Sequence, residues 1–222
     1  TNNFSLGANS PTSFDAGSHS FLQNTVNADA SRLFPTIFNG LNLAFGAEYR
    51  LENYKINAGE IGSYIDGGAQ SFPGFSPLNE VNKNRNSVAL YTDIEIDFSE
   101  KFMIGVAGRY EDYSDFGNTI NGKLSSRYKI LDNFFVRGAI STGFRAPSLH
   151  QQYFNNIAAD IVDGKPLNSG IFRNDSEVAI QLGIPKLKEE TSKNYSLGFV
   201  YSPLKNLHFT VDAYQIKIDN RI

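Results

Sequence analysis

Cysteine and tryptophan are both absent from the 222 residues, and the chain contains no long hydrophobic run. Without cysteine, it cannot form a disulfide framework, a thiolate metal site or a cysteine nucleophile. No apolar stretch approaches the ~18–20 residues that a membrane-spanning helix requires. The net charge is only −3, and the lysines and arginines are scattered among the acids, so we expect no nucleic-acid partner.

Signatures of catalysis are missing as well. The sequence holds no GxSxG elbow, Walker loop, GxGxxG fingerprint or HExxH spacing. Its three histidines, His19, His150 and His208, lie far apart along the chain. Acidic pairs such as Asp93 and Glu95 alternate along one strand, where a solvated face accounts for them better than glycosidase chemistry. We therefore expect a protein that is not an enzyme and that carries no metal or cofactor.

Period-two alternation of apolar and polar residues is the dominant signal that is present. Leu43 and Phe45, for example, share one face of a segment whose other face carries Glu48 and Arg50. Similar segments cover residues 41–52, 88–98, 102–111, 120–130, 134–142, 194–201 and 207–218, and 19–34 is a weaker eighth candidate. Alternation alone fits a soluble β-sandwich and a membrane barrel equally well. The apolar face of each strand contacts a protein core in the first and lipid in the second.

Strand length separates these two cases. The segments run to roughly 10–14 residues, whereas strands of globular proteins usually have about 5–6. At ~3.3 Å per residue, twelve residues span about 40 Å. A tilt of about 40° projects this to roughly 30 Å, the thickness of the hydrocarbon core of a bilayer. Aromatic residues gather towards the segment ends, as interfacial girdles would require.

The connections alternate in length. Short ones cover residues 35–40, 99–101, 131–133 and 203–206, and longer ones cover 57–86, 114–118 and 143–189. Outer-membrane barrels have short turns at one rim and long loops at the other. The sequence therefore predicts an all-β fold, an antiparallel up-and-down meander that is a segment of about 7–8 strands from a transmembrane β-barrel.

Three stretches carry a family resemblance. Ser141 to Gln151 contains GFRAPSLHQ, Leu187 to Phe199 reads LKEETSKNYSLGF, and Asp212 to Ile222 reads DAYQIKIDNRI. Each resembles a barrel motif of the TonB-dependent outer-membrane receptors, the motifs stand in the family's order, and the resemblance covers nearly the whole chain.

The resemblance implies a transport role in the outer membrane of a Gram-negative bacterium. Receptors of this kind import a scarce, bulky nutrient of the ferric siderophore, haem, cobalamin or oligosaccharide class. The expected partners are outer-membrane lipid, the nutrient ligand and the TonB–ExbB–ExbD complex, which acts through an N-terminal region. Residues 1–222 show no plug domain or TonB-contacting box and fewer strands than the family's 22, so we expect a partial barrel.

The external loops, residues 57–86 and 143–189, are the expected place of ligand binding, because long loops often carry function. For Arg145, at the rim, pairing with a nearby carboxylate is the favoured alternative. The candidate ligand-binding residues are Tyr64, Phe72, Phe75, Arg145, His150, Gln151, Tyr153 and Phe154.

Two other interpretations stay open at this level. The chain could be a complete small eight-stranded outer-membrane barrel with a structural or adhesive role. It could also be a soluble carbohydrate-binding β-sandwich, although such folds place turns every 8–12 residues.

Overall fold

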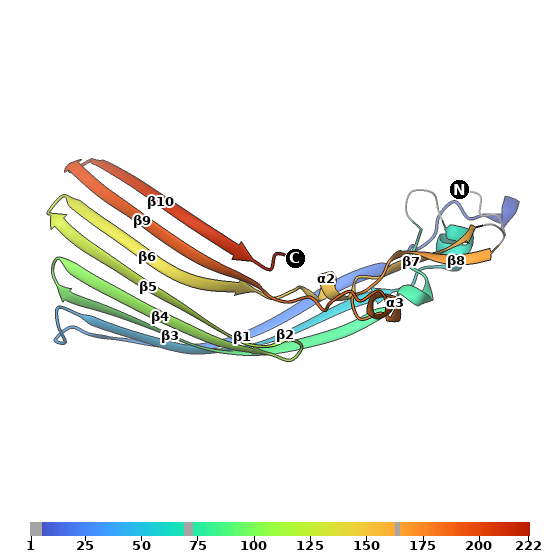
Figure 1. Cartoon of the computed structure of the whole chain (residues 1–222), viewed down its shortest axis with the longest axis horizontal. Coiled ribbons are helices and arrows are strands. Elements are labelled where there is room, and N and C mark those ends of the chain that lie inside the picture. The colour runs from blue at the N-terminus through green and yellow to red at the C-terminus, as the bar shows by residue number, and fades with distance from the viewer. Residues whose placement is uncertain (1–5, 69–72, 163–164) are drawn as a thin grey trace. The chain divides into compact units, whose positions relative to one another are not determined.

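The computed structural model describes residues 6–68, 73–162 and 165–222. These residues form one eight-stranded sheet, in the order β1-β2-β3-β4-β5-β6-β9-β10, and a separate hairpin of β7 and β8 (Figure 1). The predicted meander is confirmed, and β1 and β10 are the two edges of the sheet. No helix in the described ranges is long and apolar enough to cross a bilayer.

The sheet strands are long. Their lengths run from 12 to 19 residues, well above the globular average of about 5–6. The weak candidate at 19–34 is a full strand. The strands are β1 (Ser18–Phe34), β2 (Leu41–Asn57), β3 (Val81–Ser99), β4 (Phe102–Tyr113), β5 (Gly117–Leu131), β6 (Phe134–Arg145), β9 (Glu190–Leu204) and β10 (Leu207–Asp219).

The predicted alternation of short and long connections is present, but both long loops differ in detail. The first is shorter than expected, because β3 already begins at Val81. The sequence 82–86 is polar and lacks an apolar face, yet Asn53 on β2 donates to the side chains of Asn82 and Asn84 at 2.9 and 2.8 Å. Hydrogen bonding thus extends the strand where hydrophobic patterning gives no signal.

The second long loop carries structure of its own. It contains α2 (Leu149–Tyr153), the hairpin β7 (Asn156–Val162) and β8 (Lys165–Ile171), and α3 (Glu177–Gln181). The first loop contains α1 (Ile61–Tyr64) and two 3₁₀ turns. The chain divides into two compact units. The loop unit comprises the described residues of Thr1–Asn24, Leu51–Arg85 and Pro147–Leu187, and the sheet unit comprises Thr25–Arg50, Asn86–Ala146 and Lys188–Ile222.

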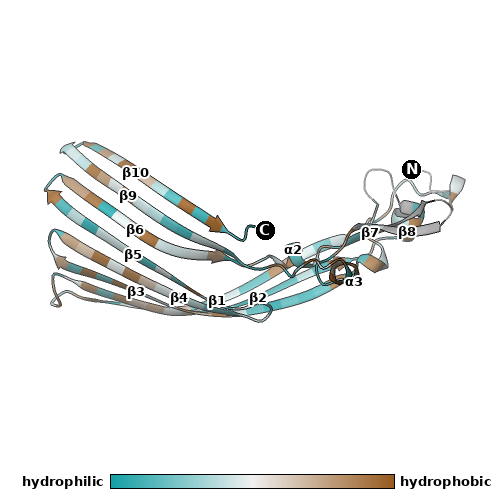
Figure 2. Cartoon of the chain, viewed as in Figure 1, coloured by the Kyte–Doolittle hydropathy of each residue, from teal (hydrophilic) through white to brown (hydrophobic). Residues whose placement is uncertain are grey.

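One face of the sheet unit is apolar and bare. Leu124 lies opposite Ile140, which in turn lies opposite Tyr195. Large side chains on this face stay open to the surroundings, with Leu197 exposed by 64% and Ile140 by 51%. Colouring by hydropathy shows brown and teal residues interspersed along each strand (Figure 2). A face this apolar and extensive requires a non-aqueous partner, as a lipid-facing barrel wall does.

The opposite face carries ion pairs that reach over intervening strands. Arg137 on β6 and Asp212 on β10 both stand in register with Gly198 on β9, and they form a bidentate pair with a shortest distance of 2.7 Å. A Cβ at Gly198 would overlap Asp212 Oδ1. Gly46 on β2 is in the same situation, since a Cβ there would lie 2.5 Å from both Asp29 and Tyr91, which are hydrogen-bonded to each other. Glycine therefore keeps space for polar pairing across a strand.

Aromatic rings line the edge of the sheet unit that carries the short turns. The ring centroids of Phe38 and Phe98 are 5.0 Å apart, those of Phe98 and Phe102 are 5.9 Å apart, and Phe102 contacts Tyr128 at 6.2 Å. Rings with this placement suit the interfacial girdle that the sequence predicts.

The β5–β6 turn at the same edge holds an exposed ion pair. Lys129 Nζ lies 2.8 Å from Asp132 Oδ1, and this hydrogen bond, together with the lysine charge, holds the pKa of Asp132 below its usual value.

Substitution of Gly198 tests the role of glycine in the cross-strand pair. We expect Gly198→Ala to lower the free energy of unfolding by about 1–3 kcal/mol, because the new methyl group displaces Asp212. Gly138→Ala is the matched control on β6, since its Cβ would meet only ordinary contacts at 3.5 and 3.8 Å. Thermal and urea unfolding of the receptor should show the difference. Adding Asp212→Ala to Gly198→Ala should recover only the part of the loss that comes from the displaced carboxylate, because the backbone oxygen of Val211 also lies 2.9 Å from the new methyl group. A loss in Gly138→Ala as large as that in Gly198→Ala would contradict the steric cause.

Candidate ligand-binding site

The loop unit is built around a small hydrophobic core. Tyr54 and Ile56 come from the end of β2, Val81 from the start of β3, Phe75 from the first long loop, and Leu149 from α2. All five are exposed by 4% or less, and they draw together segments that are distant in the sequence. The core holds both long loops together at their bases.

A buried ion pair anchors the GFRAPSLHQ motif to this core. Arg85 Nε donates to Glu52 Oε2 at 2.6 Å, and their side chains are only 5% and 9% exposed. Arg85 Nη1 also donates to the carbonyl oxygen of Pro147 at 2.7 Å. Burying two charges is tolerated only when they are paired and further hydrogen-bonded. Since Pro147 is itself buried, this arrangement determines where the second long loop begins.

The residues after Pro147 form a capped helical turn. Ser148 is the N-cap of α2, and its Oγ accepts a hydrogen bond from the Gln151 amide at 3.1 Å. The Gln151 side chain accepts in return from the Ser148 amide at 3.0 Å, which completes a capping box. The motif is therefore a structural element that ends a strand, starts a helix and inserts Leu149 into the core. Gln151, a predicted ligand contact, has this capping role in the structure.

The two long loops are joined by asparagine side chains. Asn79 is fully buried, accepts from the Ile157 amide at 2.6 Å and donates to the Ile157 carbonyl at 3.2 Å. Asn155 Nδ2 donates to the Leu78 carbonyl at 2.9 Å. Both contacts join an asparagine side chain of one loop to backbone groups of the other. The sequence contained no signal for this pairing.

Four of the predicted ligand residues lie together in the loop unit. Phe75 is 4% exposed and contacts Phe154 at a ring separation of 6.3 Å. His150 lies at 5.0 Å from Phe154 and stays exposed. Tyr153 is half-buried, and the Lys83 ammonium lies 4.9 Å from its ring centroid. Phe75 thus belongs to the interior of the unit, whereas His150 and Tyr153 reach its surface.

Tyr64 lines a separate pocket of about 400 Å³ in the loop unit. Pro73, Pro77 and Leu78 form apolar walls, and Asp66 provides a carboxylate. The pocket combines aromatic, apolar and hydrogen-bonding surface, as small-molecule sites do. Phe72, another predicted ligand residue, lies outside the described residues.

Arg145 belongs to the sheet unit. Its guanidinium lies 3.9 Å from Glu190 Oε2, and its side chain is 59% exposed. The carboxylate partner agrees with the rim pairing favoured from the sequence. An exposed pair of this kind contributes little stability, typically below about 1 kcal/mol.

A charge cluster that sequence reasoning missed occupies the polar face of the sheet unit. Glu48 Oε1 accepts from Arg50 at 2.6 Å and from Arg109 at 3.2 Å, and Arg109 also pairs with Glu111. The Glu111 carboxylate accepts from the Tyr113 hydroxyl at 2.9 Å. Each charge was visible in the alternation, but the links between β2 and β4 depend on strand order.

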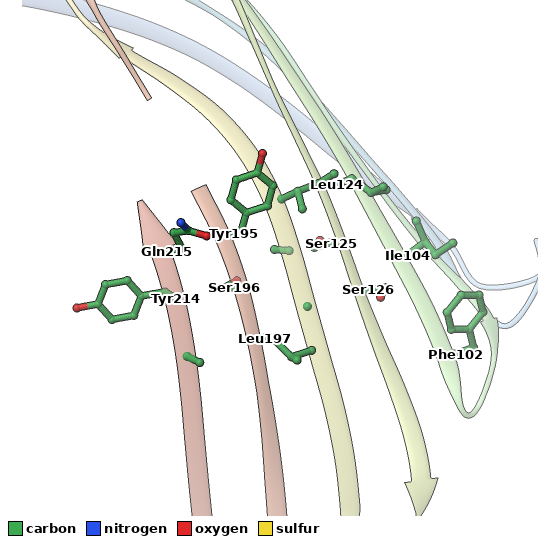
Figure 3. Close-up of a pocket in the computed structure, with 14 residues that line it drawn as sticks. Phe102, Ile104, Leu124, Ser125, Ser126, Tyr195, Ser196, Leu197, Tyr214 and Gln215 are labelled. Carbon is green, nitrogen blue, oxygen red and sulfur yellow. The ribbon is translucent and has the colours of Figure 1, made fainter. Parts of the chain in front are cut away.

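A hollow of about 730 Å³ lies on the apolar face of the sheet unit (Figure 3). The hollow is lined by large apolar side chains, namely Ile104, Leu124 and Leu197, and by small residues such as Ser126 and Gly138. It opens on the face that would contact lipid and offers few polar groups to orient a ligand. The loop unit is therefore the better candidate for nutrient binding.

Taken together, long amphipathic strands, short turns at one edge and structured loops define a wall segment of a transmembrane β-barrel. The chain belongs to the TonB dependent receptor-like, beta-barrel family, whose model matches residues 1–222.

The relatives include siderophore receptors. The chain is 25% identical over 182 residues to the ferric enterobactin receptor PirA of Pseudomonas aeruginosa, a match covering 81% of this chain and 23% of PirA. The crystal structure of PirA from the same species has a TM-score of 0.66 at 18% identity, over 91% of this chain and 33% of that one. The ferric yersiniabactin uptake receptor FyuA of Yersinia pestis has a TM-score of 0.55 at 16% identity, over 90% and 29%. The chain thus spans about a quarter to a third of these proteins, and the structures establish the shared fold.

The buried Glu52–Arg85 pair generates a stability prediction. Glu52→Gln removes the carboxylate charge that pairs with the buried Arg85, so we expect the anchor at Pro147 to lose about 3–5 kcal/mol of local stability. Native-state hydrogen exchange of the amides in residues 147–157 measures this loss. Asp175→Asn is the control. Lys83, on the same strand as Arg85, lies 3.3 Å from Asp175, which also pairs with Arg173 at 2.9 Å. Both pairs are at the surface, so their loss should cost less than about 1 kcal/mol each. Equal effects of the two substitutions would contradict the burial argument.

Proposed function

We propose that this chain is part of an outer-membrane, TonB-dependent receptor that imports a ferric siderophore. Family membership over residues 1–222 is the observation that carries the proposal. The sheet supports it physically, because a bare apolar face and a charged face on the same strands suit lipid on one side and an aqueous lumen on the other. The role is transport rather than catalysis.

The siderophore class is favoured over the other nutrients considered. The relatives described above are named as receptors for ferric enterobactin and ferric yersiniabactin, and as siderophore receptors. Haem, cobalamin and oligosaccharides have no such support. Energy from the inner membrane would reach the receptor through the TonB–ExbB–ExbD complex, as the family resemblance implies.

Within the loop unit, we assign ligand contact to exposed or half-buried aromatic and polar side chains. Tyr64 at the 400 Å³ pocket is the strongest candidate, followed by Tyr153 and His150. Aromatic rings can stack on the aromatic groups of a catecholate siderophore, and hydroxyl groups can bond to its oxygens. Gln151 stands in α2 with His150 and Tyr153, and the Phe154 ring lies 5.0 Å from that of His150, so both belong with these two residues and not with the Tyr64 pocket.

The two alternative interpretations fit less well. A complete eight-stranded barrel requires β1 to pair with β10, but these strands are the two edges of the sheet in the described residues. A β-sandwich requires two sheets with their apolar faces packed together, whereas the apolar face here remains exposed.

Uptake of radioactive iron tests the proposed function. A strain that lacks the gene encoding this chain should import a ferric siderophore poorly under iron limitation, and the intact gene should restore uptake. Collapse of the proton-motive force should also stop import, because uptake by this class is energised. The siderophores to compare are ferric enterobactin and ferric yersiniabactin, after the names of the relatives. Unchanged uptake of both in the deletion strain, with loss of haem or cobalamin import instead, would refute the siderophore assignment.

Two substitutions separate ligand contact from core packing. Tyr64→Ala should weaken siderophore binding by roughly tenfold, equal to about 1.4 kcal/mol, with little change in stability. Phe75→Ala should instead destabilise the loop unit by about 3–5 kcal/mol, because it removes a buried ring. Isothermal titration with the ferric siderophore and thermal unfolding of the receptor measure the two effects. If Tyr64→Ala left affinity unchanged, the pocket would lose its assignment.

A further inference from the structure

Two histidines from distant parts of the sequence lie side by side in the loop unit. His19 stands near the start of β1, and His150 stands in α2. Their ring centroids are 6.2 Å apart, with an angle of 47° between the ring planes. Neither motif nor spacing in the sequence pointed to this pair.

Both imidazole rings contact aromatic side chains of the buried core. His19 contacts Phe75 at a ring separation of 6.5 Å, and His150 contacts Tyr54 edge-on at 5.6 Å. Phe75 and Tyr54 are almost fully buried, whereas both histidines are exposed. The capping box of α2 and the buried Leu149 hold the backbone of His150 in place. The two rings are thus presented at a surface by a rigid base.

The ring nitrogens of the pair are available. In the described part of the chain, neither His19 nor His150 has a side-chain hydrogen bond or a carboxylate partner. The third histidine differs, because His208 Nδ1 lies 2.8 Å from Ser202 Oγ. Neutral imidazole nitrogen is the commonest protein ligand for transition metals.

We propose that His19 and His150 form a two-histidine site for a divalent transition-metal ion such as Cu²⁺ or Zn²⁺. A metal ion about 2.0–2.1 Å from one nitrogen of each ring places the ring centroids roughly 5.2 Å apart at a tetrahedral angle and roughly 6.4 Å apart at a linear one. The observed separation of 6.2 Å lies near the wide end of this range, so binding of a tetrahedral ion requires side-chain rotations that bring the rings about 1 Å closer together. This inference goes beyond nutrient import and does not depend on the siderophore assignment.

The chemistry of the pair limits what it can bind. Among the described residues, no group of three or more His, Cys, Asp or Glu side chains is arranged around a metal position. Water or an incoming ligand therefore completes the coordination, and the ion remains exchangeable. Imidazole favours Cu²⁺, Ni²⁺ and Zn²⁺ over the oxygen-preferring Mg²⁺ and Ca²⁺, and affinity should follow the order Cu²⁺ > Zn²⁺ > Mn²⁺.

Metal titration of the purified, chelator-treated receptor tests the site with CuCl₂ and ZnCl₂ as probes. His19→Asn and His150→Asn should each weaken binding of one ion by on the order of 100-fold, because the second ligand acts at high effective concentration. The double variant should lose that same single ion and no other. Electron paramagnetic resonance of the Cu²⁺ form should show coupling to two imidazole nitrogens in the wild type and to one in each single variant. His208→Asn is the matched control and should bind as the wild type does.

Several outcomes would overturn the proposal. Unchanged Cu²⁺ affinity in both single variants would show that the rings are in contact only as part of the aromatic cluster. Loss of two ions in the double variant would show that the histidines bind separately. Thermal unfolding of each variant checks that the loop unit stays folded, and His150→Gln provides a second, longer substitution if His150→Asn disturbs α2.

Discussion

Strand register is the constraint on which the rest of the sheet depends. Side chains alternate with a period of two, so a slip of one residue would move Arg109 and Glu111 to the apolar face and Val106 and Tyr110 to the charged face. Both faces are strongly marked, so a slip in register would place charges on the apolar face and apolar side chains on the charged face. Ion pairs such as Arg137–Asp212 also restrict the strand register, because this pair forms only when Gly198 lies between the two residues.

Electrostatics on the charged face follows from this register. Arg127 and Arg137 stand directly opposite each other on β5 and β6, an arrangement that is unfavourable by itself. Each finds a carboxylate on its other side, with Asp97 at 3.9 Å from Arg127 and Asp212 at 2.7 Å from Arg137. Each of these pairs offsets the repulsion between the two facing arginines.

In the loop unit, buried contacts at the base position exposed side chains at the surface. Long loops in an outer-membrane receptor must be rigid at the base and adaptable at the surface if they are to present binding groups. Here the Glu52–Arg85 pair, the asparagine links and the five-residue core provide the base. The aromatic and imidazole groups stand above it, where His19, His150 and Tyr153 are accessible to a ligand or an ion. Preorganisation of this kind lowers the entropy lost on binding.

The sequence by itself determined the fold class, the approximate strand boundaries, the family and the location of the loops. These depend on local periodicity and on motifs, which each strand carries without its neighbours. The tertiary structure alone decided that β3 starts at Val81 and that Phe75 is buried, because these depend on side chains contributed by other segments. It also decided which charges meet across strands and that His19 lies beside His150. Such contacts join residues that are far apart along the chain, and no local pattern encodes a distance in space.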